Sequence, residues 1–208
     1  IKDLKIFRHI IPNISLFIPQ VAIQVYTVLD KTMIGMIISE KSEVGYYEQA
    51  EKIIQMLLTI VTSFIGVIIP RASNSYANGE KQKLKEYMNS SFSVIMMLAF
   101  PVMFGLISIS KKFVPIFYGE GYDKVSLLIN IMSPTIVIVG ISNIIGSAYL
   151  IPTKKDKKYT SSIIIGAVVN FILNAIFIKK YSSEGASVAT VIAEFMVTST
   201  QLILVKED

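Results

Sequence analysis

The sequence predicts an all-α, polytopic membrane protein, a bundle of about six transmembrane helices. Charged residues make up only 17% of the 208 residues, against about 25% in soluble domains, and the mean hydropathy is +0.59. The charges cluster in short tracts, and long runs of Ile, Val, Leu, Phe and Met separate them. These runs approach the roughly 20 residues that a helix needs to cross the hydrocarbon core of a bilayer.

Six spans can be drawn, and together they make residues 1–208 a single transmembrane domain. The expected spans are about 11–37, 50–73, 87–109, 123–150, 159–178 and 184–205. They must be helices, because an open strand leaves backbone groups unpaired in lipid. We expect this chain to be a fragment of a longer protein, since it starts at Ile1 and ends just after an apolar run.

The distribution of basic residues between loops predicts the orientation. The N-terminus, the second and fourth loops and the C-terminus carry Lys2, Lys5, Arg8, Arg71, Lys81, Lys83, Lys85, Lys154, Lys155, Lys157, Lys158 and Lys206. The other side carries the smaller set Lys41, Lys52, Lys111, Lys112, Lys124, Lys179 and Lys180. The positive-inside rule therefore places both termini in the cytoplasm.

The residue types present exclude several kinds of site. The chain has no Cys and a single His, His9, which argues against disulfides, thiolate metal sites and a cysteine nucleophile. It contains neither a G-x-S-x-G motif nor a Walker A loop, so we expect no enzyme activity and no cofactor. The net charge of +5 comes from loop residues between apolar spans, so we expect no nucleic-acid partner.

Polar residues recur inside the spans with helical spacing. The first span has Asn13, Gln20, Gln24, Thr27 and Lys31 on one face, with Asp30 beside it; the second has Gln55, Thr59, Thr62 and Gly66; the fifth has Gly166, Asn170 and Asn174; the last has Ser187, Thr190, Glu194, Thr198 and Gln201. A charge at the bilayer centre costs about 3 kcal/mol on insertion scales. We therefore expect these stripes to face a shared interior, either a helix seam or a watered cavity.

Plain structural interpretations remain open at each position. Small residues and Asn often only join membrane helices, as Gly166 and Asn174 would. Lys31 lies near the predicted outer end of its span and can extend its amine to the interface. Glu194 lies in the middle of its span, and in its protonated form it can hydrogen-bond a neighbouring helix.

Several short motifs occur in an order that resembles a known family. They are Phe17-Ile18-Pro19-Gln20, Val28-Leu29-Asp30-Lys31-Thr32-Met33-Ile34-Gly35, Val44-Gly45-Tyr46-Tyr47-Glu48-Gln49-Ala50-Glu51-Lys52, Pro70-Arg71-Ala72-Ser73, Phe100-Pro101-Val102-Met103-Phe104-Gly105, Tyr118-Gly119-Glu120-Gly121-Tyr122 and Gly185-Ala186-Ser187-Val188-Ala189-Thr190-Val191-Ile192-Ala193-Glu194. Together they resemble the C-terminal half of Wzx-type polysaccharide repeat-unit flippases, within the multidrug/oligosaccharidyl-lipid/polysaccharide exporter superfamily.

The resemblance implies a larger protein whose two lobes of helices enclose a central cavity. This chain would be the C-terminal lobe, and the N-terminal lobe would be missing. Such a protein flips undecaprenyl-pyrophosphate-linked oligosaccharide across the bacterial cytoplasmic membrane by ion-coupled alternating access. The product would supply capsule, exopolysaccharide or O-antigen assembly, and the partners would be membrane lipids, a polysaccharide polymerase and assembly proteins.

The same resemblance implies roles for individual residues. Cavity cations would hold the pyrophosphate, a role that Lys31 and Arg71 fit. The stripe of Gln20, Gln24 and Thr27 would line the substrate path together with Asp30. Glu194 or Asp30 would take up the coupled proton or Na⁺.

Three other functions stay open from the sequence. A multidrug or metabolite exporter of the same superfamily would share the fold and differ in substrate. A membrane glycan polymerase would need a catalytic Asp or Arg pair in a long external loop, and no external loop here carries an Arg. A membrane scaffold would have no cavity.

Overall fold

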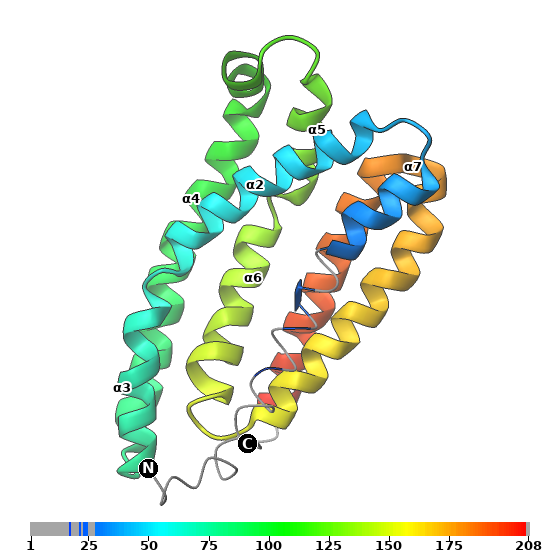
Figure 1. Ribbon diagram of the computed structural model, residues 1–208. Coiled ribbons are helices and arrows are strands. Elements are labelled where there is room, and N and C mark those ends of the chain that lie inside the picture. The colour runs from blue at the N-terminus through cyan, green and yellow to red at the C-terminus, as the bar shows by residue number, and fades with distance from the viewer. Residues whose placement is uncertain (1–16, 18–20, 22, 25–27, 207–208) are drawn as a thin grey trace, which may run out of the picture.

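The computed structural model describes residues 17, 21, 23, 24 and 28–206, and within them it is an all-α bundle (Figure 1). Residues 28–37 form the described end of a first helix. The later elements are α2 (Ser42–Thr62), α3 (Ile65–Ala77), α4 (Lys81–Tyr118), α5 (Asp123–Met132), α6 (Thr135–Asn143), the π-helix η1 (Ile144–Leu150) and α7 (Asp156–Lys206). The described residues contain no strand, so the predicted fold class is confirmed.

Two of the predicted spans are broken helices. Helices α2 and α3 meet at a bend of 43°, and together they are long and apolar enough to cross a membrane once. The fourth predicted span consists of α5, α6 and η1, with a break at Ser133 and Pro134. Proline has no N–H to donate to the preceding turn, which accounts for a break at this point.

Helix α4 is a candidate span by itself and is longer than the sequence indicates. It continues past the predicted end at residue 109 to Tyr118, although it contains Pro101 and Pro115. The chain then turns through Gly119 and Gly121, whose φ values of 86° and 90° favour glycine. The external loop is therefore much shorter than predicted.

Helix α7 is one element made of two halves that run back along each other. Its 51 residues would extend about 75 Å as a straight helix, more than twice the hydrocarbon thickness of about 30 Å. The backbone breaks at Ser182, with φ 51° and ψ −133°. Figure 1 shows the yellow first half and the orange-to-red second half lying side by side. The halves pack so closely that a Cβ added at Gly166 would collide with Val197.

A buried carboxylate anchors this reversal. Glu43, at the start of α2, is 5% exposed. Its oxygens lie 2.7 and 2.9 Å from Lys124 Nζ at the start of α5. The backbone N–H and the hydroxyl of Ser183 also donate to Glu43 Oε2, at 3.1 and 2.6 Å. Three elements are thus tied together where α7 turns, a contact that the sequence analysis did not foresee.

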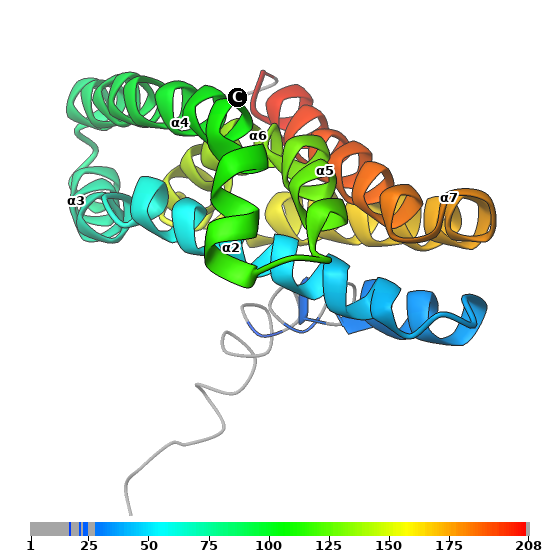
Figure 2. The same cartoon turned by 90° about the horizontal axis from the view of Figure 1, so that it is seen from above.

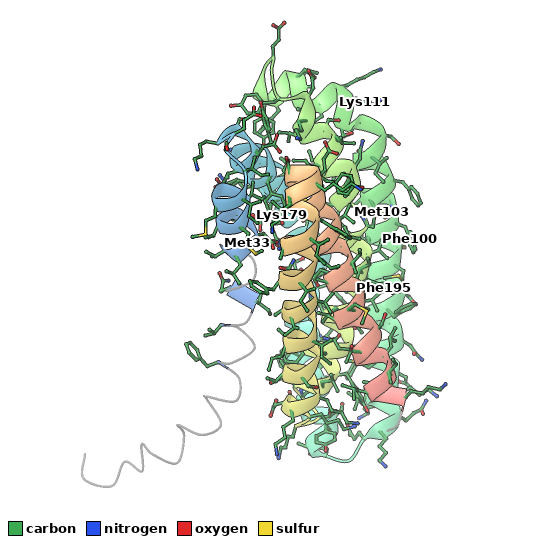
Figure 3. All side chains as sticks on the ribbon, turned by 90° about the vertical axis from the view of Figure 1, so that its right-hand side faces the viewer. Met33, Phe100, Met103, Lys111, Lys179 and Phe195 are labelled. Atoms are coloured by element: carbon green, nitrogen blue, oxygen red, sulfur yellow. The ribbon has the colours of Figure 1, made fainter. Side chains whose placement is uncertain are left out.

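The turns separate into two ends of the bundle. In Figure 1 the α3–α4 turn, the start of α7 and its C-terminal end lie at one end, and the α4–α5 turn and the α7 reversal lie at the other. Lys111 and Lys179 lie toward the second end in Figure 3. This is the separation of loops that the predicted orientation requires.

The interior is packed and the perimeter is apolar. Helices α5 and α6 lie between α4 and the later half of α7 (Figure 2). Ile95, Leu128 and Ile136 are fully buried in this region. The outer surface carries large exposed apolar side chains such as Phe100 on α4 and Phe195 on α7 (Figure 3). Such a surface suits lipid and not water.

Candidate functional site

A cleft of about 290 Å³, lined by both polar and apolar side chains, opens between helices from across the chain. Its described lining is Ile23 and Asp30 from the first helix; Glu51, Ile54, Gln55, Leu58, Thr59 and Thr62 from α2; Met132, Thr135, Val139, Ser142 and Asn143 from α5 and α6; and Tyr159, Ile163, Thr190 and Glu194 from α7. The structure therefore brings Asp30, which borders the first predicted stripe, together with residues of the second and last predicted stripes.

Asp30 is the most enclosed acid of the cleft, with 1% of its surface exposed. The Tyr47 hydroxyl on α2 donates to Asp30 Oδ2 at 2.8 Å. Thr190 Oγ1, on the second half of α7, lies 3.1 Å from the same oxygen. The amide of Asn174, on the first half of α7, donates to Oδ1. One carboxylate thus joins four helical segments.

Two buried asparagines extend this network. Asn174 Nδ2 also donates to Asn170 Oδ1, at 3.0 Å, and both side chains are fully buried. Within the described part of the chain, Asn170 Nδ2 and Asn174 Oδ1 have no hydrogen-bond partner. Buried polar atoms are almost always satisfied by protein or ordered water. The pair thus leaves one donor and one acceptor available beside Asp30.

Lys31 is engaged by an acid. Its Nζ lies 2.8 Å from Glu51 Oε2, and the Lys31 side chain is 33% exposed. Glu51 lines the cleft, and Lys31 reaches it through this pair. The only ammonium group that the sequence analysis assigned to the cavity is therefore already balanced by a carboxylate.

Arg71 lies elsewhere. It lines a separate pocket of about 450 Å³ at the α3–α4 turn, with Asn74, Asn78, Glu80 and Lys83. Lys83, 2.8 Å from Glu80, lowers the pKa of that exposed carboxyl by hydrogen bonding. The structure thus does not group Arg71 with Lys31 and Asp30, because the α2–α3 helix pair carries it to one end of the bundle.

The other predicted site residues fall into three groups. Glu194 is half-buried and lines the cleft one turn after Thr190. Gln24 is exposed on the first helix and is not part of the lining. Gln20 and Thr27 lie outside the described residues.

Several cleft residues were not predicted from the sequence. Glu51 precedes Gln55 by one helical turn, so the stripe on α2 could have been extended backwards to include it. Tyr47 appeared only within the motif from Val44 to Lys52 and was given no role of its own. Thr135 and Asn143 enter the cleft because α6 is a separate segment after the break at Pro134.

Comparison with known proteins gives a consistent set of relatives. A profile of the family described as polysaccharide biosynthesis protein matches residues 13–127, more than half of the chain. A Haloferax volcanii protein, named a probable low-salt glycan biosynthesis flippase, is 26% identical over 81% of the chain and 35% of its own length. Lipid II flippase MurJ of Bacillus subtilis is 27% identical over 67% of the chain and 26% of its length.

The fold is also that of a solved flippase structure. Lipid II flippase MurJ in an inward closed conformation superimposes with a TM-score of 0.82 at 23% identity, covering 91% of this chain and 41% of that one. The chain therefore spans between a quarter and a half of the length of these relatives.

Proposed function

This chain belongs to the polysaccharide biosynthesis protein family, and from that premise we propose that it takes part in moving a lipid-linked glycan across a membrane. The observation that carries the proposal is a cleft that carries polar groups inside an apolar bundle, with Asp30 buried against it. A pyrophosphate and a glycan cannot cross hydrocarbon unaided, because burying polar and charged groups without partners is costly. A cleft lined by hydroxyls, amides and carboxylates lowers that barrier.

The cleft works as part of a larger cavity. Gln55 and Thr59 are exposed where they line it, and the relatives are longer than this chain. We assign this chain to the C-terminal lobe of a two-lobed exporter, with a second lobe of the same protein closing the cavity. Rocking of the two lobes then exposes the cavity to one side of the membrane at a time.

The cargo is an undecaprenyl-pyrophosphate-linked oligosaccharide in this proposal. It is used for capsule, exopolysaccharide or O-antigen assembly, and a polymerase and assembly proteins receive it outside the cell. The excess of basic residues on one set of loops supports an orientation with both termini of this chain in the cytoplasm.

Asp30 is the proposed site of the coupled ion. A buried carboxylate is costly unless it is compensated, and Asn174 Oδ1 and the Thr190 oxygen lie on segments that contact it. A proton on the carboxyl, or Na⁺ among these oxygens, neutralises the charge. Because Asp30 joins the first helix, α2 and both halves of α7, loss of the ion would alter how these helices pack. Glu194 is a second candidate on the same cleft.

The test is transport by the complete protein in its host. Asp30→Asn keeps the shape and removes the charge, and we expect lipid-linked glycan to accumulate on the inner leaflet while surface polymer falls. Glu120→Gln, an exposed acid in the α4–α5 turn, is the matched control and should transport normally. Normal transport by Asp30→Asn at equal membrane abundance would remove Asp30 from the mechanism.

The same assay separates the proposal from a drug or metabolite exporter. An exporter of small molecules would leave lipid-linked glycan on the inner leaflet unchanged when the gene is deleted. The flippase proposal requires that precursor to accumulate.

A further inference from the structure

The charge of the cleft is unusual for a surface that meets a pyrophosphate. Among the described lining residues the carboxylates are Asp30, Glu51 and Glu194, and no lysine or arginine is present. Lys31 approaches only through its pair with Glu51. The described lining of the cleft therefore contains three acidic side chains and no basic one.

The backbone offers no anion site there either. Helix α6 begins at Thr135 on the cleft wall, and a helix N-terminus can bind phosphate through free N–H groups. Here the N–H groups of residues 136, 137 and 138 donate to the carbonyls of Ser133 and Pro134, at 3.0 to 3.2 Å. The N–H groups at the N-terminus of α6 are thus already hydrogen-bonded to the preceding turn.

The polar groups that remain are those that suit sugar hydroxyls. The Thr59 hydroxyl donates to the Gln55 carbonyl at 2.8 Å and the Thr62 hydroxyl donates to the Leu58 carbonyl at 2.8 Å. Each oxygen therefore stays available as an acceptor. The Gln55 side chain supplies both donors and an acceptor, and a carboxylate accepts hydrogen bonds from hydroxyls.

From these observations we infer that this part of the cavity recognises the uncharged glycan of the lipid-linked cargo and does not bind its pyrophosphate. The inference rests on the proposed function and adds that different parts of the complete protein bind the glycan and the pyrophosphate. Phosphate recognition favours arginine, lysine and free helix N-termini, so it belongs to other parts of the complete protein. A cleft of about 290 Å³ is at the lower end of ligand pockets, about 300–1,000 Å³, and holds part of an oligosaccharide.

The proposal assigns different roles to Lys31 and to the α2 stripe. Lys31 is a positioning residue that fixes Glu51 at the cleft wall. Gln55 and Thr59 are glycan contacts. Acidic sugars are disfavoured beside Glu51, whose carboxylate faces this surface and whose described cation, Lys31, is already paired with it.

The experiment measures binding of two lipids to the purified complete protein. One probe is polyprenyl pyrophosphate without sugar, and the other is the same lipid carrying an uncharged oligosaccharide. The double variant Gln55→Ala/Thr59→Ala should lower affinity for the glycan-bearing lipid about tenfold, the loss expected for one or two hydrogen bonds. It should leave affinity for the sugarless lipid unchanged. Gln82→Ala, an exposed residue of α4 outside the cleft lining, controls for substitution itself.

The variant Lys31→Met tests whether the Lys31 amine binds the pyrophosphate. Its affinity for the sugarless lipid should equal that of the unmodified protein. Equal losses for both lipids in either variant would overturn the inference and leave the proposed function standing. Failure of the unmodified complete protein to bind either lipid would overturn the proposed function, and the inference with it.

Discussion

At the scale of single residues, the Asp30 network decides how the helices meet. Asp30 and Tyr47 lie on different helices, and their hydrogen bond is buried. The sequence indicated that Asp30 borders a polar face, but not that Tyr47, Asn174 and Thr190 converge on it. Helical periodicity gives the face of one helix, whereas contacts between helices depend on how those helices cross.

Tyr47→Phe should weaken this network without changing the packed ring. The substitution removes the 2.8 Å hydrogen bond to Asp30, and hydrogen bonds to charged groups contribute about 1.5–3 kcal/mol. We expect a lower midpoint of thermal unfolding in detergent. Tyr46→Phe is the neighbouring control, since the Tyr46 ring packs on Tyr122 and its hydroxyl has no bond to Asp30. Equal midpoints for the two variants would contradict the role given to Tyr47.

At the scale of elements, the reversal of α7 and the breaks in other spans shape the bundle. The apolar runs predicted where helices lie, because length and hydropathy alone identify a span. They did not predict the π-helical η1, the extension of α4 to Tyr118 or the anchoring of Ser183 by Glu43. These features depend on local backbone geometry and on contacts between distant segments.

Glu43→Gln should destabilise the reversal more than an exposed ion pair would. Breaking a buried pair costs about 3–5 kcal/mol, and Glu43 binds Lys124 and Ser183 together. Glu48→Gln, in the exposed pair with Lys52 on the same helix, should cost less than about 1 kcal/mol. Chemical unfolding of both variants in the same detergent compares them. Similar losses would show that the buried cluster is not a structural anchor.

Substituting alanine for glycine should change the stability of the protein in opposite directions at one position in α7 and one in α4. Gly166→Ala places a methyl group against Val197 in the close contact between the halves of α7, and overpacking costs about 1–3 kcal/mol. Gly105→Ala meets nothing within 4 Å, so the helix gains about 0.5–1 kcal/mol of stability from the alanine. Thermal unfolding in detergent measures both. A neutral Gly166→Ala would contradict the close packing.

At the scale of the whole molecule, the chain buries several polar side chains within an apolar core and exposes large apolar side chains on its perimeter. Met36, Met97 and Ile116 are 81%, 77% and 86% exposed, while Asp30, Asn170 and Gln201 are buried. Composition predicted this arrangement, and the motif-based resemblance to exporters is confirmed by the family match and by the fold of the solved flippase. The sequence did not predict that Arg71 lies away from the cleft, because residue spacing along a helix does not show how far along that helix the cleft extends.

The two ends of the bundle should be labelled from different sides of the membrane. A cysteine at Glu120, in the α4–α5 turn, should react with an impermeant maleimide added to intact cells. A cysteine at Asn78, in the α3–α4 turn, should react only after the membrane is opened. The reverse pattern would invert the orientation that the basic residues predict.

The most direct test of the central claim is whether the cleft holds water while the neighbouring helix face contacts lipid. This chain has no cysteine, so single cysteines can be placed in a complete protein freed of any others. Thr59 lines the cleft, and Ile60, the next residue, is 60% exposed outside its lining. Thr59→Cys should react with a water-soluble maleimide and be protected by the glycan-bearing lipid, while Ile60→Cys stays unreactive. Equal reaction at both positions, or reaction at Ile60 alone, would contradict a transport path through this cleft.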